Sequence, residues 1–450
     1  MKVCKFGGSS LANAEQIRKV CDIMLSDPSR RVIVVSAPGK RTRDDIKVTD
    51  LLIALANARI GGYDGQSELQ AVLRRFSAIA DDLGLSDNIM ETIEKDLQQR
   101  ICIDCSNTMR FMDALKAAGE DNCARLVADY LNNIGRLAVY VDPREAGMLL
   151  TEEYGNAQIL PEAYTQLARL KDRPGILVFP GFFGYSRSGQ IVTFSRGGSD
   201  ITGSILSAAL DAQVYENWTD VDSVYAVNPS LVSNPHPIYE ITYDEMRELA
   251  YAGFTVLHEE ALTPAYRKGI PVNIRNTNNP SARGTMIVKS RGNFEGVVTG
   301  IAGAKGFCTL NMSKYLMNRE VGFALRVLKI LADEQIPFEH MPSGIDSLSI
   351  VMRQEVFTSS KEQIVIRRLV DELGIEKISI SRNLAIVMIV GEAMARTVGV
   401  TARAANALSK AGVNLEIINQ GSSEISVMFG VREEYCNYAV KELYKEFFLR

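Results

Sequence analysis

The chain has 450 residues, enough for about three domains of ordinary size. Hydrophobic residues make up 46% of the sequence and charged residues 23%, which excludes a disordered or fibrous protein. The 54 acidic residues outnumber the 50 basic ones, so the formal net charge is −4 and binding to nucleic acid phosphates is disfavoured.

No apolar run approaches the roughly 18 residues needed to cross a bilayer, so we expect no membrane partner. Residues 2–6 predict a strand at once, without a signal-peptide pattern, and we expect a cytoplasmic protein. Seven cysteines are too few for a disulfide framework. Cys102 and Cys105 form a lone C-x-x-C pair, which we interpret as reduced thiols in or near a helix. No motif in the sequence predicts a metal site built from protein ligands alone.

Strand-like and helix-like segments alternate from the N-terminus to about residue 290. β-branched runs predict strands at 32–35, 176–179, 214–218 and 270–274, and helical periodicity predicts helices at 14–25, 49–57, 122–135 and 201–210. This alternation is typical of an α/β fold with a mostly parallel sheet sandwiched by helices. Thr242 and Glu245 predict a capping box that opens a helix over 243–251. Turn formers at 276–284 mark the expected end of this first unit.

A glycine-rich corner follows the first predicted strand. Lys5, Gly7, Gly8 and Ser9 stand where this strand gives way to a helix. Paired glycines let backbone N–H groups approach an anion, and Lys5 would supply a point charge for a phosphate oxygen. A plain strand-to-helix turn with a surface lysine explains the same residues, and neither a Walker loop nor a G-x-G-x-x-G fingerprint is present.

A second corner of the same design follows a later strand. Gly197 and Gly198 form the turn, and a helix is expected to start near Asp200. Ser199 or Asp200 could simply cap that helix. Arg196, however, supplies a planar fork suited to a carboxylate or a phosphate. Two Gly-Gly turns, each with a cation, predict a site that holds several anionic groups.

Two further segments carry candidate polar groups. Thr219 and Asp220 follow the strand at 214–218, at the edge where parallel sheets bind ligands. Asp220 could coordinate Mg²⁺ or bond a nucleotide, although Asp-rich turns are commonly only turns. Glu120 precedes the helix predicted at 122–135, where acidic residues are favoured in any case. A functional Glu120 would need a cationic partner, such as the amino group of a ligand.

The C-terminal third contains an internal repeat. A shift of 77 residues carries 321–352 onto 398–429 without a gap. Each copy predicts a loop, a helix, a strand, a tight turn and a second strand, and apolar strands precede the copies at 308–311 and 385–390. Such units indicate two small α+β modules of the ferredoxin-like kind. We therefore expect a catalytic domain over 1–292, a first module over 300–380 and a second over 381–450.

The ordered motifs KFGGSS, VVSAPGK, TDLL, GED, GFFG, FSRGGSDITGS, NWTDVDSVY and IPVNIRNTNNPSARGT resemble those of one family. The chain is similar, over essentially its whole length, to the aspartokinases of the amino acid kinase superfamily, and its repeated modules resemble their paired ACT domains. The resemblance implies transfer of the γ-phosphoryl group of ATP, with Mg²⁺, to the side-chain carboxylate of L-aspartate. The product, 4-phospho-L-aspartate, would open the route to lysine, threonine and methionine, with feedback regulation by an end product.

The resemblance also implies roles for individual residues. The expected catalytic residues are Lys5 and Asp200. Lys5 would stabilise the transferring phosphoryl group, and Asp200 would organise Lys5 or Mg²⁺. The expected substrate contacts are Thr49, Glu120 (to the ammonium), Arg196 (to a carboxylate), Gly197, Gly198 and Ser199. The expected nucleotide contacts are Lys5, Gly7, Gly8, Ser9, Thr219, Asp220 and Tyr225. A lysine or threonine effector would contact Met317, Gly322, Phe323, Ser343, Gly344 and Asp346. A lid at 39–47 and a homodimer or dimer of dimers through the ACT modules are also expected.

The sequence departs from the family at two positions that commonly bear cations. Ser230 stands where an arginine is usual, and Thr255 where a lysine is usual; Arg267 and Lys268 could compensate. The first module has Pro342-Ser343-Gly344 instead of the T-S-E turn often found where an effector binds. Three alternatives stay open: a kinase of another small acid such as glutamate or acetylglutamate, a non-catalytic amino-acid sensor, and modules that serve dimerisation alone.

Overall fold

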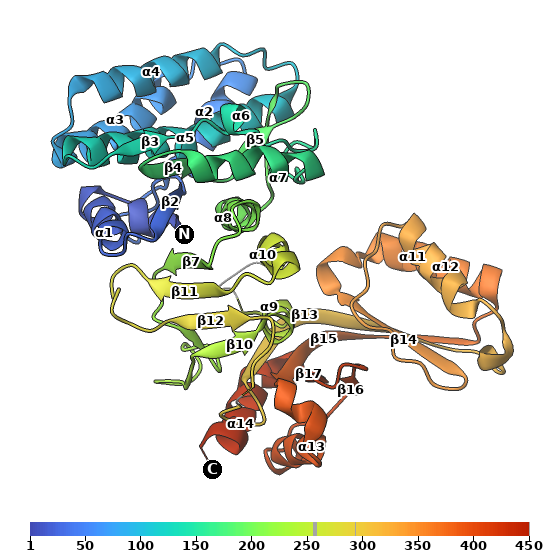
Figure 1. The fold of residues 1–450 in the computed structure, drawn as a ribbon. Coiled ribbons are helices and arrows are strands. Elements are labelled where there is room, and N and C mark those ends of the chain that lie inside the picture. Colours follow the sequence, from blue (N-terminus) through green and yellow to red (C-terminus); the bar gives the residue numbers. More distant parts are fainter. Residues whose placement is uncertain (255–258, 293, 450) are drawn as a thin grey trace. The chain divides into compact units, whose positions relative to one another are not determined.

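The computed structural model describes residues 1–254, 259–292 and 294–449 (Figure 1). The chain forms two compact units. The first comprises Met1–Val224, Pro237–Met246 and Thr255–Arg291, and the second comprises Tyr225–His236, Arg247–Phe254 and Gly292–Arg450. Within the described residues, no helix is both long and apolar enough for a membrane span. The cytoplasmic location stays a prediction.

The first unit is built on an eight-stranded sheet. Its strands are, in spatial order, β10 (Glu240–Thr242), β12 (Thr285–Val288), β11 (Val272–Asn276), β7 (Val214–Thr219), β1 (Lys2–Phe6), β2 (Arg30–Val35), β4 (Ile176–Pro180) and β3 (Ala138–Tyr140). The six strands from β11 to β3 are parallel, and β12 and β10 run the other way. The mostly parallel sheet is confirmed.

Two details of this sheet differ from the prediction. The turn formers at 276–284 do not end the unit, because the chain returns as β12 and pairs Thr285 with Ile274 of β11. The strand expected before the second glycine corner, β6 (Ile191–Thr193), pairs with β5 (Phe183–Tyr185) in a separate hairpin. Two short strands, β8 (Val224–Tyr225) and β9 (Pro237–Ile238), complete the strands formed by residues 1–292.

Helices cover both faces of the sheet. They are η1 (Gly8–Leu11), α1 (Ala14–Leu25), α2 (Val48–Ile60), α3 (Gln66–Leu83), α4 (Asp87–Ile101), α5 (Thr108–Asn133), α6 (Pro143–Ala146), α7 (Pro161–Leu167), η2 (Ala168–Asp172), α8 (Gly198–Ala209), η3 (Glu259–Leu262) and α10 (Thr263–Lys268), with α9 (Tyr243–Tyr251) beginning in this unit. Figure 1 shows α2, α3, α4 and α5 together as a helical layer. The helix at 14–25 is confirmed, whereas the one expected at 122–135 is only the second half of α5.

Alternation along β1 and β7 separates two environments. Cys4 and Phe6 belong to the apolar core that α1 to α5 complete. Lys5 points to the other face, opposite Asn217 in the parallel register of β1 and β7. There α8 lies close to the sheet, because a Cβ atom at Gly203 would fall only 2.6 Å from the ring of Tyr215. This close approach brings the first turn of α8 to the strand ends.

The second unit contains a five-stranded sheet of antiparallel strands. Its strands are, in spatial order, β14 (Ser347–Arg353), β13 (Gly300–Ser313), β15 (Lys377–Val390), β17 (Ser426–Arg432) and β16 (Ile417–Gln420). Its helices are η4 (Met317–Arg319), α11 (Phe323–Asp333), η5 (Gln354–Val356), α12 (Ser359–Leu373), η6 (Glu392–Arg396), α13 (Val400–Lys410), η7 (Glu433–Tyr435) and α14 (Cys436–Phe448). The 77-residue shift carries β13 onto β15 and α11 onto α13, so the repeat is confirmed.

The long strands β13 and β15 interlock the two copies. Residues 300–305 of β13 pair with 385–390 of β15, which pair in turn with β17. Residues 307–313 pair instead with β14 and with the first half of β15. The break falls at Gly306 (φ 86°) and at its repeat counterpart Asn383 (φ 56°), both in the left-handed region. The predicted boundary between 380 and 381 therefore falls inside β15.

The prediction of a strand before β14 in the first copy is wrong. Its counterpart in the second copy is β16, but the residues that precede β14 make only isolated bridges, His340 with Val351 and Ser343 with Leu348. Pro337 and Pro342 interrupt this segment, and proline has no N–H to donate to a ladder. The final helix of each copy, α12 or α14, was not predicted.

Candidate active site

The predicted catalytic residues Lys5 and Asp200 lie in direct contact. Lys5 Nζ is 2.6 Å from Asp200 Oδ1. Asn217 Nδ2 donates a hydrogen bond of 2.7 Å to the same oxygen. Lys5 is 8% exposed, so water screens this cluster little. Asn217 is a site residue that the sequence reasoning missed, although its position opposite Lys5 in the sheet could have revealed it.

The corner formed by Gly7 and Gly8 is shaped by close backbone contacts. The Gly7 N–H donates to the Trp218 carbonyl over 3.1 Å, and the Gly39 N–H donates to the Gly8 carbonyl over 2.8 Å. A Cβ atom at Gly8 would fall 2.9 Å from the Ala37 carbonyl oxygen. Gly8 also begins η1, and no side chain of its N-cap residue, Gly7, caps this helix. N–H groups at the start of a helix are a common binding site for anions.

The second corner holds the first turn of α8. Its N-cap is Gly197, with φ 77° and no side-chain cap. The interpretation of Ser199 or Asp200 as the cap is therefore wrong, because Asp200 lies inside the helix and its carboxylate faces Lys5. Gly198 packs so tightly that a Cβ atom would fall 2.6 Å from the ring of Phe182. Arg196 is exposed beside this turn.

Glu120 lies in the middle of α5, not before a helix as predicted. Gly119 allows α5 to approach the end of β2, since a Cβ atom there would fall 2.7 Å from Ala37 Cβ. Burial raises the pKa of Glu120 from 4.5 to about 8, against a hydrogen bond from the Ala37 main chain and the charge of Lys116, which lower it. Its Oε2 is buried and has no hydrogen-bond partner among the described residues. Such a carboxylate oxygen suits a ligand cation.

Thr49, a predicted substrate contact, is close to this carboxylate in the fold. It is half-buried in the first turn of α2, which has no side-chain cap. Its neighbour Val48 lies 3.7 Å from where a Cβ atom at Gly119 would stand. The structure thus brings the start of α2 next to the segment that carries Glu120.

The predicted nucleotide residues after β7 form a polar turn. Thr219 Oγ1 donates to Asp220 Oδ1 over 3.2 Å, and Asp220 is exposed. Tyr225 is the first residue of the second unit and its role stays a prediction. Ser230 also lies in that unit, where its N–H donates to Asn228 Oδ1 over 2.9 Å. The substitution at Thr255 lies outside the described residues.

Lys268 does not take the place of a missing nucleotide cation in this structure. Its Nζ lies 3.5 Å from Asp211 Oδ1, just beyond the end of α8. The helix has 12 residues, which separates that end from the glycine corner by about 18 Å. Arg267 precedes Lys268 in the same short helix, α10.

Three of the predicted effector residues, Met317, Phe323 and Asp346, lie beside Lys314 of the first module. The Lys314 N–H donates to the Asp346 carbonyl over 3.1 Å, and the Met317 N–H donates to the Lys314 carbonyl over 3.2 Å. Phe323 begins α11 after the left-handed Gly322, and its ring lies 6.0 Å from Lys314 Nζ. Ser343 and Gly344 form the exposed turn before β14. Asp346 Oδ1 is buried and has no hydrogen-bond partner among the described residues.

No protein-only metal cluster is present in the described part of the chain. No three His, Cys, Asp or Glu side chains gather there in a way that could hold an ion. Cys102 and Cys105 are free cysteines at the turn between α4 and α5. Any divalent cation at the glycine corners would therefore need ligand oxygens in addition to those of the protein.

Comparisons with known proteins identify the family of the chain. The model of the amino acid kinase family matches residues 1–276, so the chain belongs to that family, and an ACT domain model matches residues 387–447. The chain is 54% identical over 448 residues to aspartokinase 3 of Bacillus subtilis (strain 168), covering 100% of this chain and 99% of the relative.

Solved structures give the same answer. The crystal structure of Clostridium acetobutylicum aspartate kinase is 38% identical with a TM-score of 0.87, covering 99% of this chain and 100% of that one. Two crystal structures of E. coli aspartokinase III, 27% identical in sequence, are also similar. The complex with aspartate and ADP has a TM-score of 0.77 and covers 99% of both chains. The complex with lysine and aspartate has a TM-score of 0.75 and covers 100% of this chain and 99% of that one. Within the amino acid kinase family the chain is an aspartokinase, an ATP-dependent kinase that acts on aspartate.

Proposed function

We propose that the two glycine corners hold ATP and L-aspartate so that the γ-phosphoryl group passes to the side-chain carboxylate, giving 4-phospho-L-aspartate. The observation that carries this proposal is the contact of 2.6 Å between Lys5 and Asp200, which joins the two corners. E. coli aspartokinase III has been crystallised with aspartate and ADP, which supports the choice of ligands.

The chemistry requires charge neutralisation more than proton transfer. An aspartate side chain has an ordinary pKa near ~3.9 and is ionised at neutral pH, so the nucleophile needs no general base. It must, however, approach a triphosphate of the same sign. Lys5 supplies positive charge in a site that is largely closed to water, and the N–H groups of the glycine corners add oriented dipoles.

Each remaining site residue has a role in this proposal. Gly7, Gly8 and Ser9 line the phosphates, and Thr219, Asp220 and Tyr225 line the rest of the nucleotide. Arg196, with Gly197, Gly198 and Ser199, binds a carboxylate of the substrate. Glu120 pairs with the substrate ammonium, and Thr49 lies beside the substrate. The buried Oε2 of Glu120, without a partner among the described residues, supports its role.

Mg²⁺ fits this site as a partner of the phosphates. Mg²⁺ is commonly bound by one or two carboxylates together with phosphate oxygens and water. Asp200 would hold it here, since this carboxylate stands at the junction of the two corners. The ion would neutralise phosphate charge, while Lys5 and the glycine N–H groups orient the phosphates.

The test is a coupled ADP-release assay with aspartate, glutamate and N-acetylglutamate as acceptors. We expect turnover with aspartate and a loss of at least about 100-fold in kcat for Lys5→Ala. Lys2→Ala is the matched control, because Lys2 begins the same strand but pairs with Asp27 and Glu216, away from the glycine corner. Near-normal activity of Lys5→Ala, or turnover of glutamate without aspartate, would contradict the proposal.

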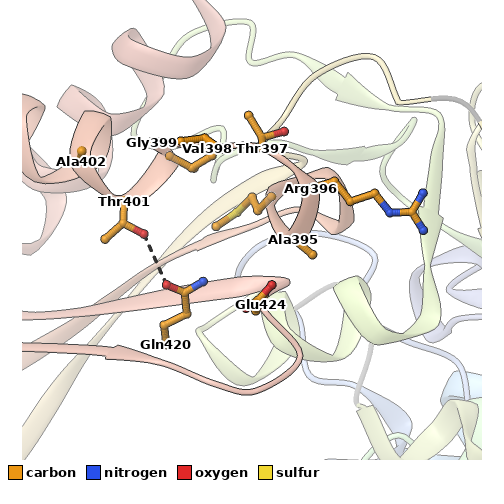
Figure 2. A pocket seen from close by; sticks show the side chains of 11 residues that line it. Ala395, Arg396, Thr397, Val398, Gly399, Thr401, Ala402, Gln420 and Glu424 are labelled. Carbon is orange, nitrogen blue, oxygen red and sulfur yellow. Dashed lines mark hydrogen bonds between the residues drawn. The ribbon is translucent and has the colours of Figure 1, made fainter.

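We propose further that an end-product amino acid regulates the enzyme through the repeated modules. E. coli aspartokinase III has been crystallised with lysine, which favours lysine over threonine as the effector. In the first module the buried Oδ1 of Asp346 is available to an effector ammonium. The second module contains a cavity of about 370 Å³. Figure 2 shows side chains that line it, including Thr401 and Gln420, and Thr401 Oγ1 donates to Gln420 Oε1 over 3.5 Å.

This cavity occupies the repeat-equivalent position of the predicted effector residues. Met394, Gly399 and Gln420 line it, and the 77-residue shift relates them to Met317, Gly322 and Ser343. Initial rates with lysine, threonine and both together identify the effector. Asp346→Asn should relieve inhibition if the effector binds the first module. Glu424→Gln should relieve it if the effector binds the second.

The modules are also our proposed dimer contact. Val321 and Val398, related by the repeat, are 99% and 100% exposed in the isolated chain. A second copy that covered these valines would remove their apolar surface from water. Light scattering should show a homodimer that dissociates in the double variant Val321→Asp, Val398→Asp.

The domain limits and the place in metabolism complete the proposal. We assign residues 1–292 to catalysis, 307–381 to the first module, and 300–305 with 384–449 to the second, as the strand pairing suggests. The product is an acyl phosphate that water destroys, so an enzyme that consumes it must follow. That step would lead to lysine, threonine and methionine.

A further inference from the structure

The loop at 39–47 is held to the rest of the first unit by one buried arginine. Arg75 lies on α3 and is 5% exposed. Its Nη2 donates to the Gly39 carbonyl over 2.5 Å and to the Ala12 carbonyl over 3.3 Å. Its Nη1 makes an ion pair of 2.9 Å with Asp45 Oδ2. The guanidinium thus joins the two ends of the loop.

Gly39 transmits this attachment to the first glycine corner. The Gly39 N–H donates to the Gly8 carbonyl over 2.8 Å. A Cβ atom at Gly39 would fall 2.5 Å from the Gly8 carbonyl carbon and 2.8 Å from the Ser9 nitrogen. The two backbones therefore touch along Gly8 and Ser9, and a shift of Gly39 must move the corner.

Asp45 fixes the other end of the loop. Besides its ion pair with Arg75, it accepts hydrogen bonds from the Arg41 main chain over 2.8 Å and from the Arg41 side chain over 2.9 Å. Burial acts to raise the pKa of Asp45, but the bonds from Arg41 outweigh it and the pKa is lowered. The loop then leads directly into α2, whose second residue is Thr49.

We propose that Arg75 is a positioning residue for phosphoryl transfer. Its polar partners among the described residues are Ala12, Gly39 and Asp45, and none of these is a predicted substrate contact. From α3 it binds both Gly39 and Asp45 of the loop, and Gly39 in turn contacts Gly8. Arg75 thereby fixes the N–H groups of the Gly7–Gly8 corner, which would receive the ATP phosphates. This inference rests on the proposed function of the Gly7–Gly8 corner. Arginine suits the task, because its rigid fork serves a carbonyl and a carboxylate at once, which lysine cannot do with the same geometry.

The test compares nucleotide binding and turnover in Arg75→Lys and Arg75→Met with the unaltered protein. We expect kcat/KM for ATP to fall about 10- to 100-fold in Arg75→Met, because small displacements of positioning groups have effects of that size. Arg75→Lys should recover part of this loss. The Kd for MgADP, measured by calorimetry, should rise about tenfold in Arg75→Met, because the corner would no longer be held in place. A tenfold rise corresponds to a loss of about 1.4 kcal/mol of binding free energy.

Arg100→Met is the matched control for lost stability. Arg100 is buried on the neighbouring α4 and also bonds a carbonyl and carboxylates, of Ala114, Asp96 and Asp121. We expect a comparable fall in melting temperature with an unchanged Kd for MgADP. If Arg75→Met does not fold, Asp45→Asn removes one attachment at a 13% exposed side chain, and its Kd should rise severalfold.

The outcomes separate the inference from the proposed function. Unchanged kcat/KM and Kd in the folded Arg75 variants overturn the inference. If the Arg75 variants do not fold, unchanged values in Asp45→Asn overturn it instead. In either case an inactive Lys5→Ala leaves the proposed function intact. An equal loss of MgADP affinity in Arg100→Met also overturns it, because the effect would then be one of general stability. Near-normal turnover by Lys5→Ala counts instead against the proposed function itself.

Discussion

Replacing Glu120 by glutamine should make the enzyme more stable and less able to bind aspartate. Glu120 is 6% exposed, and burial raises its pKa from 4.5 to about 8. Because the folded state holds the proton more tightly than the unfolded state, the free energy of unfolding falls as the pH rises between these two values. At about 1.36 kcal/mol per pKa unit, the loss at pH 7 relative to pH 4.5 is on the order of 3 kcal/mol.

Glutamine mimics the protonated carboxyl group and should remove this loss. The assay is urea unfolding followed by the fluorescence of Trp218, the only tryptophan of the chain, which is buried in the first unit. We expect Glu120→Gln to be more stable than the unaltered protein at pH 7 and similar to it at pH 5. Glu15 is an exposed acid that forms an ion pair with Lys19, and Glu15→Gln should be close to neutral at both pH values.

The same substitution should weaken aspartate binding. A buried ammonium without its counter-charge costs about 3 kcal/mol or more, so KM for aspartate should rise at least about 100-fold. In the unaltered protein about one tenth of Glu120 is ionised at pH 7, and KM for aspartate should improve about tenfold by pH 9. A Glu120→Gln enzyme that is less stable at pH 7, or that binds aspartate normally, would refute the reasoning.

Three further substitutions test single contacts. Asn217→Ala removes the 2.7 Å hydrogen bond to Asp200, and kcat should fall about tenfold, measured by ADP release with melting temperature unchanged within a few degrees. Gly203→Ala places a Cβ atom 2.6 Å from the Tyr215 ring and should destabilise the first unit by about 1 to 3 kcal/mol in the Trp218 assay; no change would mean that α8 has room to move. Thr242→Ala breaks the capping box of α9 and should cost about 1 kcal/mol with full activity, so a loss of activity would contradict a purely structural role.

The sequence predicted the features that depend on local pattern. The glycine pairs mark the two corners, and the predicted catalytic residues Lys5 and Asp200 lie in contact with each other. The capping box of Thr242 and Glu245 is confirmed by hydrogen bonds of 2.9 Å and 3.3 Å in both directions. In each case the residues that carry the signal are also those that make the contact.

Other features were out of reach because distant residues decide them. α5 was missed in its first half, and its start misplaced, because polar residues in its middle are buried in a network with another helix. Arg100 Nη2 donates to Asp121 over 2.6 Å, and Asn122 Nδ2 donates to Asp96 over 2.9 Å. These buried polar groups interrupt the apolar periodicity on which a helix prediction depends. Arg75 carries no motif, and its partners belong to loops that only the fold brings to α3.

The interlocked strands β13 and β15 have a consequence for any attempt to dissect the regulatory half. A protein cut after residue 380 would lose β17 and the half of β15 that pairs with residues 300–305. The front half of β13 would then be a bare edge, open to pairing with other molecules. A cut in the sequence that removes one module also removes a strand from the other. We therefore expect truncated forms to aggregate, and the two intact modules to unfold in one cooperative transition.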